Sequence, residues 1–128
     1  MVAAFNIYKA DVVLHQPKEH QDITIIRIKE VVTEVTGIVW QQINRHTRTR
    51  DIMFARQLFH YLCRTFTDYT LKKIGELTFH NYGHFTILHS KSEIENIIDL
   101  KNRSSNYKIV ESAILRMTAY TGKIIIYT

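Results

Sequence analysis

The chain contains a single proline, Pro17, and only four glycines in 128 residues. Proline and glycine are the residues that most strongly end or weaken a helix. Because no proline follows Pro17, the sequence favours a mainly α-helical fold, a small helical bundle, over its middle. With 45% hydrophobic and 23% charged residues, a chain of this length can bury the core of one compact domain.

Apolar residues recur at the three- and four-residue spacing of helices along most of the chain. The predicted helices cover residues 22–36, 39–43, 51–66, 70–77, 84–99 and a last stretch around 109–117. Gly37 is placed to end the first helix, and Thr70 is placed to cap the fourth. Gly83 marks the expected start of the fifth helix.

The two ends of the chain differ from this middle. Residues 3–14, AAFNIYKADVVL, and residues 123–128, KIIIYT, are rich in β-branched and aromatic side chains. Such residues favour strands. We therefore expect two short terminal β-strands, which pair with each other or with a partner chain in self-association.

The positive charge is concentrated in one part of the sequence. The net charge is +5, and residues 45–73 alone hold seven basic and two acidic side chains. The basic residues of this window are Arg45, Arg48, Arg50, Arg56, Arg64, Lys72 and Lys73. The rest of the chain is electrically balanced. A patch of this kind suits a polyanion such as nucleic acid, whereas the alternative is a solvated helix face.

Several function classes find no support in the sequence. The single cysteine, Cys63, rules out an internal disulfide framework and suits a reducing cytoplasm. No apolar run is long enough for a membrane span, and the start lacks a secretory pattern. No phosphate-binding loop and no nucleophile–base pair can be recognised, so we expect neither a nucleotide, a cofactor nor an enzyme activity.

Residues 70–90, TLKKIGELTFHNYGHFTILHS, contain a short helix, a turn and a second helix in close succession. Together with the preceding RTRDIMFARQLFHYLCRTFTDY, this stretch resembles the C-terminal DNA-binding domain of the bacterial replication initiator DnaA. The matching motifs are Ala55-Arg56-Gln57, Thr70 to Gly75 with the sequence TLKKIG, and His84 to His89 with the sequence HFTILH. The resemblance covers about residues 24–100 with order and spacing nearly kept.

The resemblance implies a helix-turn-helix of the DnaA C-terminal or Trp-repressor-like type, with double-stranded DNA as the partner. We expect three parts: an N-terminal extension over residues 1–21, possessing at most a short strand, the DnaA-like helix-turn-helix domain over 22–103, and a C-terminal helix with a strand-like tail over 104–128 that packs on the same domain. The resemblance also implies a cytoplasmic protein that acts on the bacterial nucleoid or in a phage-infected cell, as a free-standing relative without the initiator's ATPase.

The resemblance also assigns roles to individual residues. It implies that Arg48, in the basic loop NRHTRTRD of residues 44–51 together with Arg50, enters the minor groove. It also implies that Arg56 contacts a phosphate. Further contacts fall near the start of the supporting helix, on Thr70, Leu71, Lys72 and Lys73. The base-reading stretch falls on Gly83, His84, Phe85 and Thr86.

General physical chemistry agrees with these roles. An arginine on a loop is attracted by the negative potential of a narrow minor groove, and cations beside the groove fix the orientation of the protein. His84 can donate to a purine acceptor, and Thr86 can meet a thymine methyl group or a phosphate. Gly75 has no Cβ, so the two helices of the motif can approach closely.

Three departures from the family pattern leave the target sequence open. Gly83 stands where the family has an acidic residue, and Phe85 stands where it has a small hydroxyl residue. The turn TFHNYG is also one residue longer than usual and lacks a glycine pair. We therefore expect duplex DNA binding, in replication initiation control or transcription regulation, more firmly than recognition of the initiator's usual site.

Two other interpretations remain. The first is an adaptor that keeps the fold but binds a protein, such as the host initiator or a virion component, through Phe85 and the strand-like ends. The second is a metal site formed by His80, His84 and His89, but these residues lack a familiar zinc spacing. We therefore expect no metal.

Overall fold

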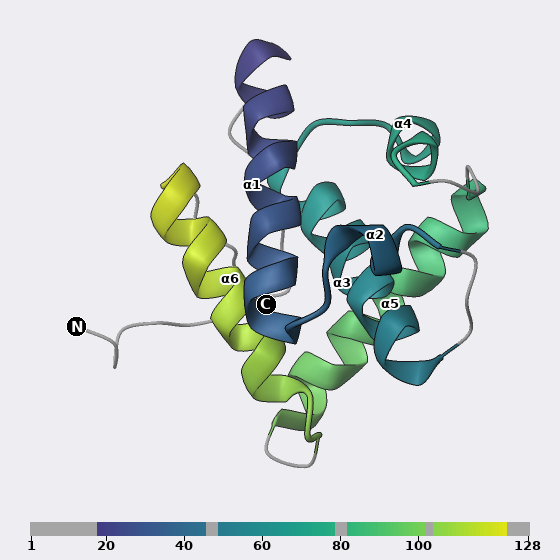
Figure 1. Cartoon of the computed structure of the whole chain (residues 1–128), viewed down its shortest axis with the longest axis vertical. Helices are drawn as coiled ribbons and strands as arrows, with labels where there is room; N and C mark the ends of the chain where they lie inside the picture. The colour runs from purple at the N-terminus through teal and green to yellow at the C-terminus, as the bar shows by residue number, and fades with distance from the viewer. Residues whose placement is uncertain (1–17, 46–48, 79–81, 102–103, 123–128) are drawn as a thin grey trace.

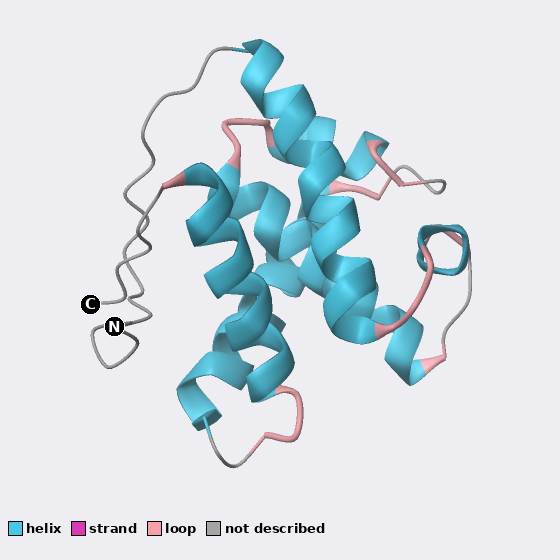
Figure 2. Cartoon of the chain, turned by 60° about the vertical axis from the view of Figure 1, so that its left-hand side comes forward, coloured by secondary structure: helices cyan, strands magenta, loops and turns pink. Residues whose placement is uncertain are grey.

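The computed structural model describes residues 18–45, 49–78, 82–101 and 104–122. These residues form six helices and no strand (Figures 1 and 2). The helices are α1 (Lys18–Thr36), α2 (Trp40–Ile43), α3 (Arg50–Phe66), α4 (Leu71–Glu76), α5 (His84–Leu100) and α6 (Tyr107–Thr121). The mainly α-helical prediction is therefore confirmed, whereas both predicted terminal strands lie outside the described residues.

α3 is the central helix of the bundle. It packs against α1 and α5 along its length and also contacts α2, α4 and α6. Large side chains of α3 are fully buried, among them Phe59, Tyr61 and Phe66. Trp40 of α2 stacks at a tilt on Phe59, with the ring centroids 4.7 Å apart. This core fixes the position of every other helix relative to α3.

α1 and α6 lie side by side, away from α4 and from the start of α5 (Figure 1). Ile28 and Val32 of α1 and Val110 of α6 are fully buried. α1 ends at Gly37, whose φ of 73° is left-handed and whose amide donates to the Thr33 carbonyl at 2.9 Å. The predicted end of this helix at Gly37 is therefore confirmed.

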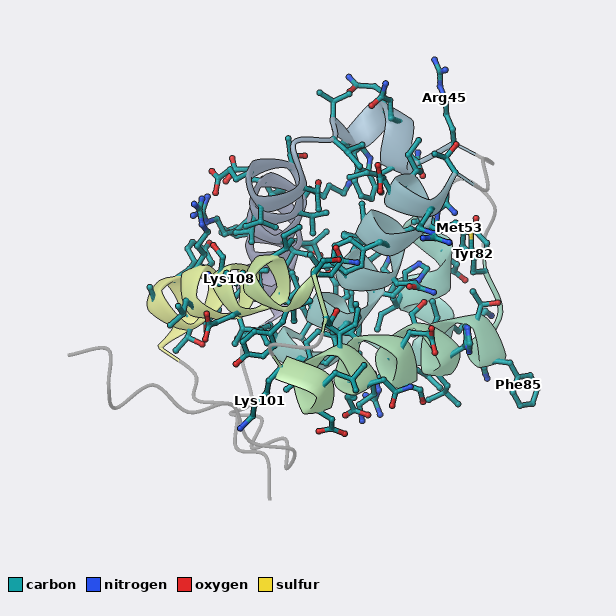
Figure 3. All side chains as sticks on the ribbon, turned by 90° about the horizontal axis from the view of Figure 1, so that it is seen from below. Arg45, Met53, Tyr82, Phe85, Lys101 and Lys108 are labelled. Carbon is teal, nitrogen blue, oxygen red and sulfur yellow. The ribbon has the colours of Figure 1, made fainter. Side chains whose placement is uncertain are left out.

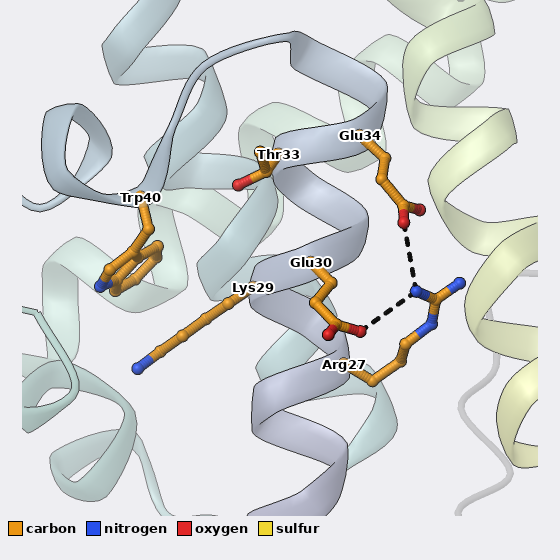
Figure 4. A pocket seen from close by; sticks show the side chains of 6 residues that line it. All are labelled: Arg27, Lys29, Glu30, Thr33, Glu34 and Trp40. Atoms are coloured by element: carbon orange, nitrogen blue, oxygen red, sulfur yellow. Dashed lines mark hydrogen bonds and ion pairs between the residues drawn. The ribbon is translucent and has the colours of Figure 1, made fainter.

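Oppositely charged side chains meet on the outer surface of α1 and α6. Arg27 lies 3.2 Å from the Glu30 carboxylate and 3.3 Å from that of Glu34, which is 2.7 Å from Arg116 of α6. Lys29 lies over the Trp40 ring. These two residues line one side of a shallow depression, and Arg27, Glu30 and Glu34 line the other side (Figure 4). The charges of this surface largely neutralise one another.

Candidate nucleic-acid interface

α4 and α5 form a helix-turn-helix that packs against α3. The Thr70 hydroxyl caps α4 by accepting a hydrogen bond from the Lys73 amide at 3.1 Å. Ile74 and Gly75 are the buried residues of α4. A Cβ placed on Gly75 would lie 1.8 Å from the Tyr82 carbonyl oxygen, just before α5. The absence of a side chain at Gly75 therefore sets how closely the two helices meet.

The first turn of α5 faces outward. His84, Phe85 and Thr86 are all exposed, and Phe85 keeps 88% of its surface accessible. Ile87 and Ser90 on the same helix are buried against the domain. The helix therefore presents its first residues away from the core, as the labelled Phe85 shows in Figure 3.

Gly83 is the residue that precedes α5. Its backbone is extended, with φ −77° and ψ 174°, and its carbonyl accepts the first hydrogen bonds of the helix from Thr86 and Ile87. No side chain caps this end of α5. The amides of the first turn of α5 consequently receive no capping hydrogen bond from position 83.

Exposed cations lie on α3 and α4, which pack against α5, and just after α2. Arg50 begins α3, Lys72 and Lys73 lie on α4, and Arg45 follows α2; all four side chains are exposed. In the described part of the chain, none of the four forms an ion pair with a carboxylate, unlike Arg27 and Arg116 on the α1–α6 surface. Arg45, Met53, Tyr82 and Phe85 gather on one side in Figure 3, opposite Lys101 and Lys108.

Arg56 differs from these cations because it is buried, with 8% of its surface accessible. Its Nε donates to the Ile43 carbonyl at 3.1 Å, and its Nη2 donates to the Arg45 carbonyl. The guanidinium carbon lies 5.6 Å from the centre of the Tyr82 ring. Arg56 thus joins the end of α2 to Tyr82, two residues before α5, the second helix of the helix-turn-helix.

His60 lies one turn further along α3 and is also buried. Its Nδ1 is 3.1 Å from the Ser90 hydroxyl of α5, and its ring meets the Tyr82 ring edge-on at 5.6 Å. Burial, followed by the nearby Arg56 charge, lowers the pKa of His60 to about 3. The imidazole is therefore neutral at physiological pH and joins α3 to the middle of α5.

Comparison with known proteins shows the family to which this arrangement of helices belongs. Residues 25–94 match the family described as the bacterial DnaA protein helix-turn-helix, which is more than half of the chain. The chain belongs to this family. The match begins in α1 and ends in α5, so it contains the central helix α3, all of α4 and α5 as far as Ile94.

Individual relatives of the DnaA helix-turn-helix family agree with this assignment. The chain is 38% identical over 79 residues to the chromosomal replication initiator protein DnaA of Streptococcus agalactiae, which covers 59% of this chain and 17% of the relative. It is 35% identical over 92 residues to that of Streptococcus uberis, covering 70% and 20%. The chain thus spans about a fifth of the length of these relatives, and no solved structure gives a significant match.

The structure brings most of the residues implied by the DnaA resemblance to one end of the molecule. Arg50, Lys72 and Lys73 are exposed near the start of α3 and on α4, and Leu71 is half-buried at the start of α4. Arg48 lies outside the described residues. Figure 1 shows α4 and the beginnings of α3 and α5 together on the right-hand side.

Sequence reasoning missed two contributors to this interface. Arg45 belongs to the basic window but matches no family motif, although its side chain is exposed. The turn TFHNYG contains Tyr82, to which the motif spacing assigns no role, yet Tyr82 contacts both Arg56 and His60. Its position two residues before an expected recognition helix is the only sequence signal that could have indicated this role.

The histidines do not form a metal site in the part of the chain that is described. His84 and His89 are exposed on α5, and His80 lies outside the described residues. No group of three or more His, Cys, Asp or Glu side chains within the described ranges could hold a metal ion. Likewise, no helix among these residues is long and apolar enough to cross a membrane.

Proposed function

We propose that this chain binds double-stranded DNA, with the start of α5 in the major groove and the basic loop in the minor groove. One observation carries this proposal: in a member of the DnaA helix-turn-helix family, the first turn of α5 is exposed beside cations that form no ion pair with a carboxylate among the described residues. A recognition helix normally enters the major groove with its N-terminal residues toward the bases. Unpaired cations beside it supply the affinity for phosphates.

The cations and the α4 start would position the protein on the duplex. Arg50, Lys72 and Lys73 would contact phosphates, and Thr70 with Leu71 would meet the backbone at the start of α4. Contacts of this type fix orientation without reading sequence. Arg48 would enter the minor groove, where the negative potential attracts arginine.

The exposed start of α5 would read base edges. His84 would donate to a purine acceptor, and Thr86 would meet a thymine methyl group or a phosphate. Phe85 offers only apolar contact, and Gly83 offers no side chain at all. These departures predict a site that differs from that of the initiator in at least the positions read by residues 83 and 85.

The biological role that best fits these features is control of replication initiation or of transcription. The relatives are named chromosomal replication initiator proteins, and the chain matches about a fifth of their length. DNA binding, rather than the full activity of an initiator, is therefore the part of their function that this chain is proposed to share.

Titration of labelled duplexes with the purified protein tests the proposal. Affinity should fall steeply as salt rises, and selection from random duplex DNA should return a consensus site. Lys72→Ala should weaken binding and lower the salt slope by about 1. Lys108→Ala is the matched control, because this exposed lysine of α6 lies on the other side of the molecule (Figure 3). If the protein bound no duplex at low salt, the proposal would be wrong.

A second candidate function is that of an adaptor that binds a protein partner instead of DNA. The 88% exposure of Phe85 favours it, together with the partial exposure of Leu88 (42%) and Met53 (40%). Phe85→Asp should then abolish the protein complex in a chain without DNA affinity. A complex that survives this change would exclude the start of α5 as the adaptor surface.

A further inference from the structure

The side chain of Arg56 joins two segments that are proposed to face DNA. On one side, its Nε and Nη2 donate to the carbonyls of Ile43, the last residue of α2, and of Arg45, at the start of the basic loop. On the other side, its guanidinium lies over the ring of Tyr82, two residues before α5. The Tyr82 carbonyl in turn lies against Gly75 of α4. One buried cation thus contacts the segments that lead into both the basic loop and the recognition helix.

The chemistry of arginine suits this position. Its planar guanidinium can donate from two nitrogens to two carbonyls while its face rests on an aromatic ring. Carbonyls at the end of a helix have no partner within the helix and need such donors. Lysine has the same charge, but its ammonium is a compact point charge that cannot keep both the pair of hydrogen bonds to the carbonyls and the contact with the aromatic ring.

We propose that Arg56 is a positioning residue for DNA binding, which orients the end of α2, through Ile43 and Arg45, and the start of α5 relative to each other instead of neutralising a phosphate. This inference rests on the proposed DNA-binding function. It changes the role that the family resemblance implies for Arg56, because its Nε and Nη2 are directed at backbone carbonyls and the side chain is buried.

Salt-dependent titrations of three variants separate the two roles. Arg56→Lys and Arg56→Ala should both weaken duplex binding about tenfold or more while the slope of log affinity against log salt stays that of the wild type. Lys72→Ala should lower that slope by about 1, as the loss of a phosphate contact does. Wild-type affinity in Arg56→Lys, together with a slope lowered by about 1 in Arg56→Ala, would show a phosphate contact and overturn the proposal.

Amide chemical shifts of the free protein give a second readout that needs no DNA. Arg56→Lys should move the signals of Arg45 and Gly83 and leave Ala113 of α6 in place, whereas general unfolding would move all three. Chemical-shift changes confined to α3 would show that Arg56 does not connect the end of α2 with the start of α5, and they would overturn the proposal. A wild type that binds no duplex defeats the proposed function, whereas an Arg56→Lys variant that binds like the wild type defeats only this inference.

Discussion

A Cβ atom built on Gly75 would lie 1.8 Å from the carbonyl oxygen of Tyr82 and 2.9 Å from its carbonyl carbon. Non-bonded atoms do not approach this closely, so α4 and the segment before α5 could not keep their positions with any other residue at 75. Since Tyr82 also contacts Arg56 and His60, this one glycine affects the placement of the whole start of α5.

Gly75→Ala should therefore destabilise the protein. Alanine is favoured over glycine inside a helix by about 1 kcal/mol, but overpacking against backbone costs about 1–3 kcal/mol and cannot be relieved by side-chain rotation. We expect a lower free energy of unfolding in urea and a loss of DNA affinity. Gly83→Ser is the matched control, because a Cβ on Gly83 meets nothing within 4 Å. Equal stability of the two variants would contradict the close approach.

Gly83→Asp should stabilise the protein and change its DNA preference. The extended backbone of Gly83 suits an N-cap, and α5 lacks a side-chain cap. Replacing glycine by aspartate at an N-cap gains a few tenths of a kcal/mol, and its charge favours the helix N-terminus. Aspartate can also accept a hydrogen bond from cytosine. Thermal unfolding should shift upward, and selection from random duplexes should return a consensus with one more specified base pair. An unchanged consensus would argue against base contact at residue 83.

Acidification should destabilise the protein through His60. Its pKa in the folded state is about 3, mainly because it is buried, whereas an unfolded histidine titrates near its ordinary value of 6.5. Between these values the unfolded chain binds one more proton, so stability is complete above about pH 6.5 and falls as pH drops toward 3. The loss approaches about 1.4 kcal/mol per pH unit. Between pH 3 and 6.5, the free energy of unfolding in urea should depend less steeply on pH in His60→Gln than in the wild type. Equal slopes in the two proteins would refute the assignment.

The sequence predicted the helices well where apolar periodicity was strong. The expected helix over residues 84–99 corresponds to α5, and the one over 51–66 corresponds to α3. The start of α1 was placed at residue 22 rather than at Lys18. Residues 18–21, KEHQ, contain no apolar side chain, so periodicity could not reveal that turn.

Tertiary contacts limited what could be predicted of the candidate site. The motif spacing located the helix-turn-helix and its exposed start, because these depend on local sequence. The environment of Arg56 depends instead on where α2 ends, and the partner of His60 lies 30 residues away at Ser90. An arginine that contacts a phosphate and one that binds carbonyls give the same sequence signal, so only the packing of α2 on α3 distinguishes them.

Thr70→Ala should destabilise α4 and weaken DNA binding together. The Thr70 hydroxyl accepts the hydrogen bond of the Lys73 amide, and its loss from an N-cap typically costs about 1 kcal/mol. Because α4 has only six residues, a frayed first turn would also displace Lys72 and Lys73 from their proposed phosphate contacts. Thr70→Ser is the control, since serine keeps the capping oxygen. We expect urea unfolding and duplex affinity of the serine variant to stay near those of the wild type, and both to fall in the alanine variant. Equal behaviour of the alanine and serine variants would mean that the cap does not position α4.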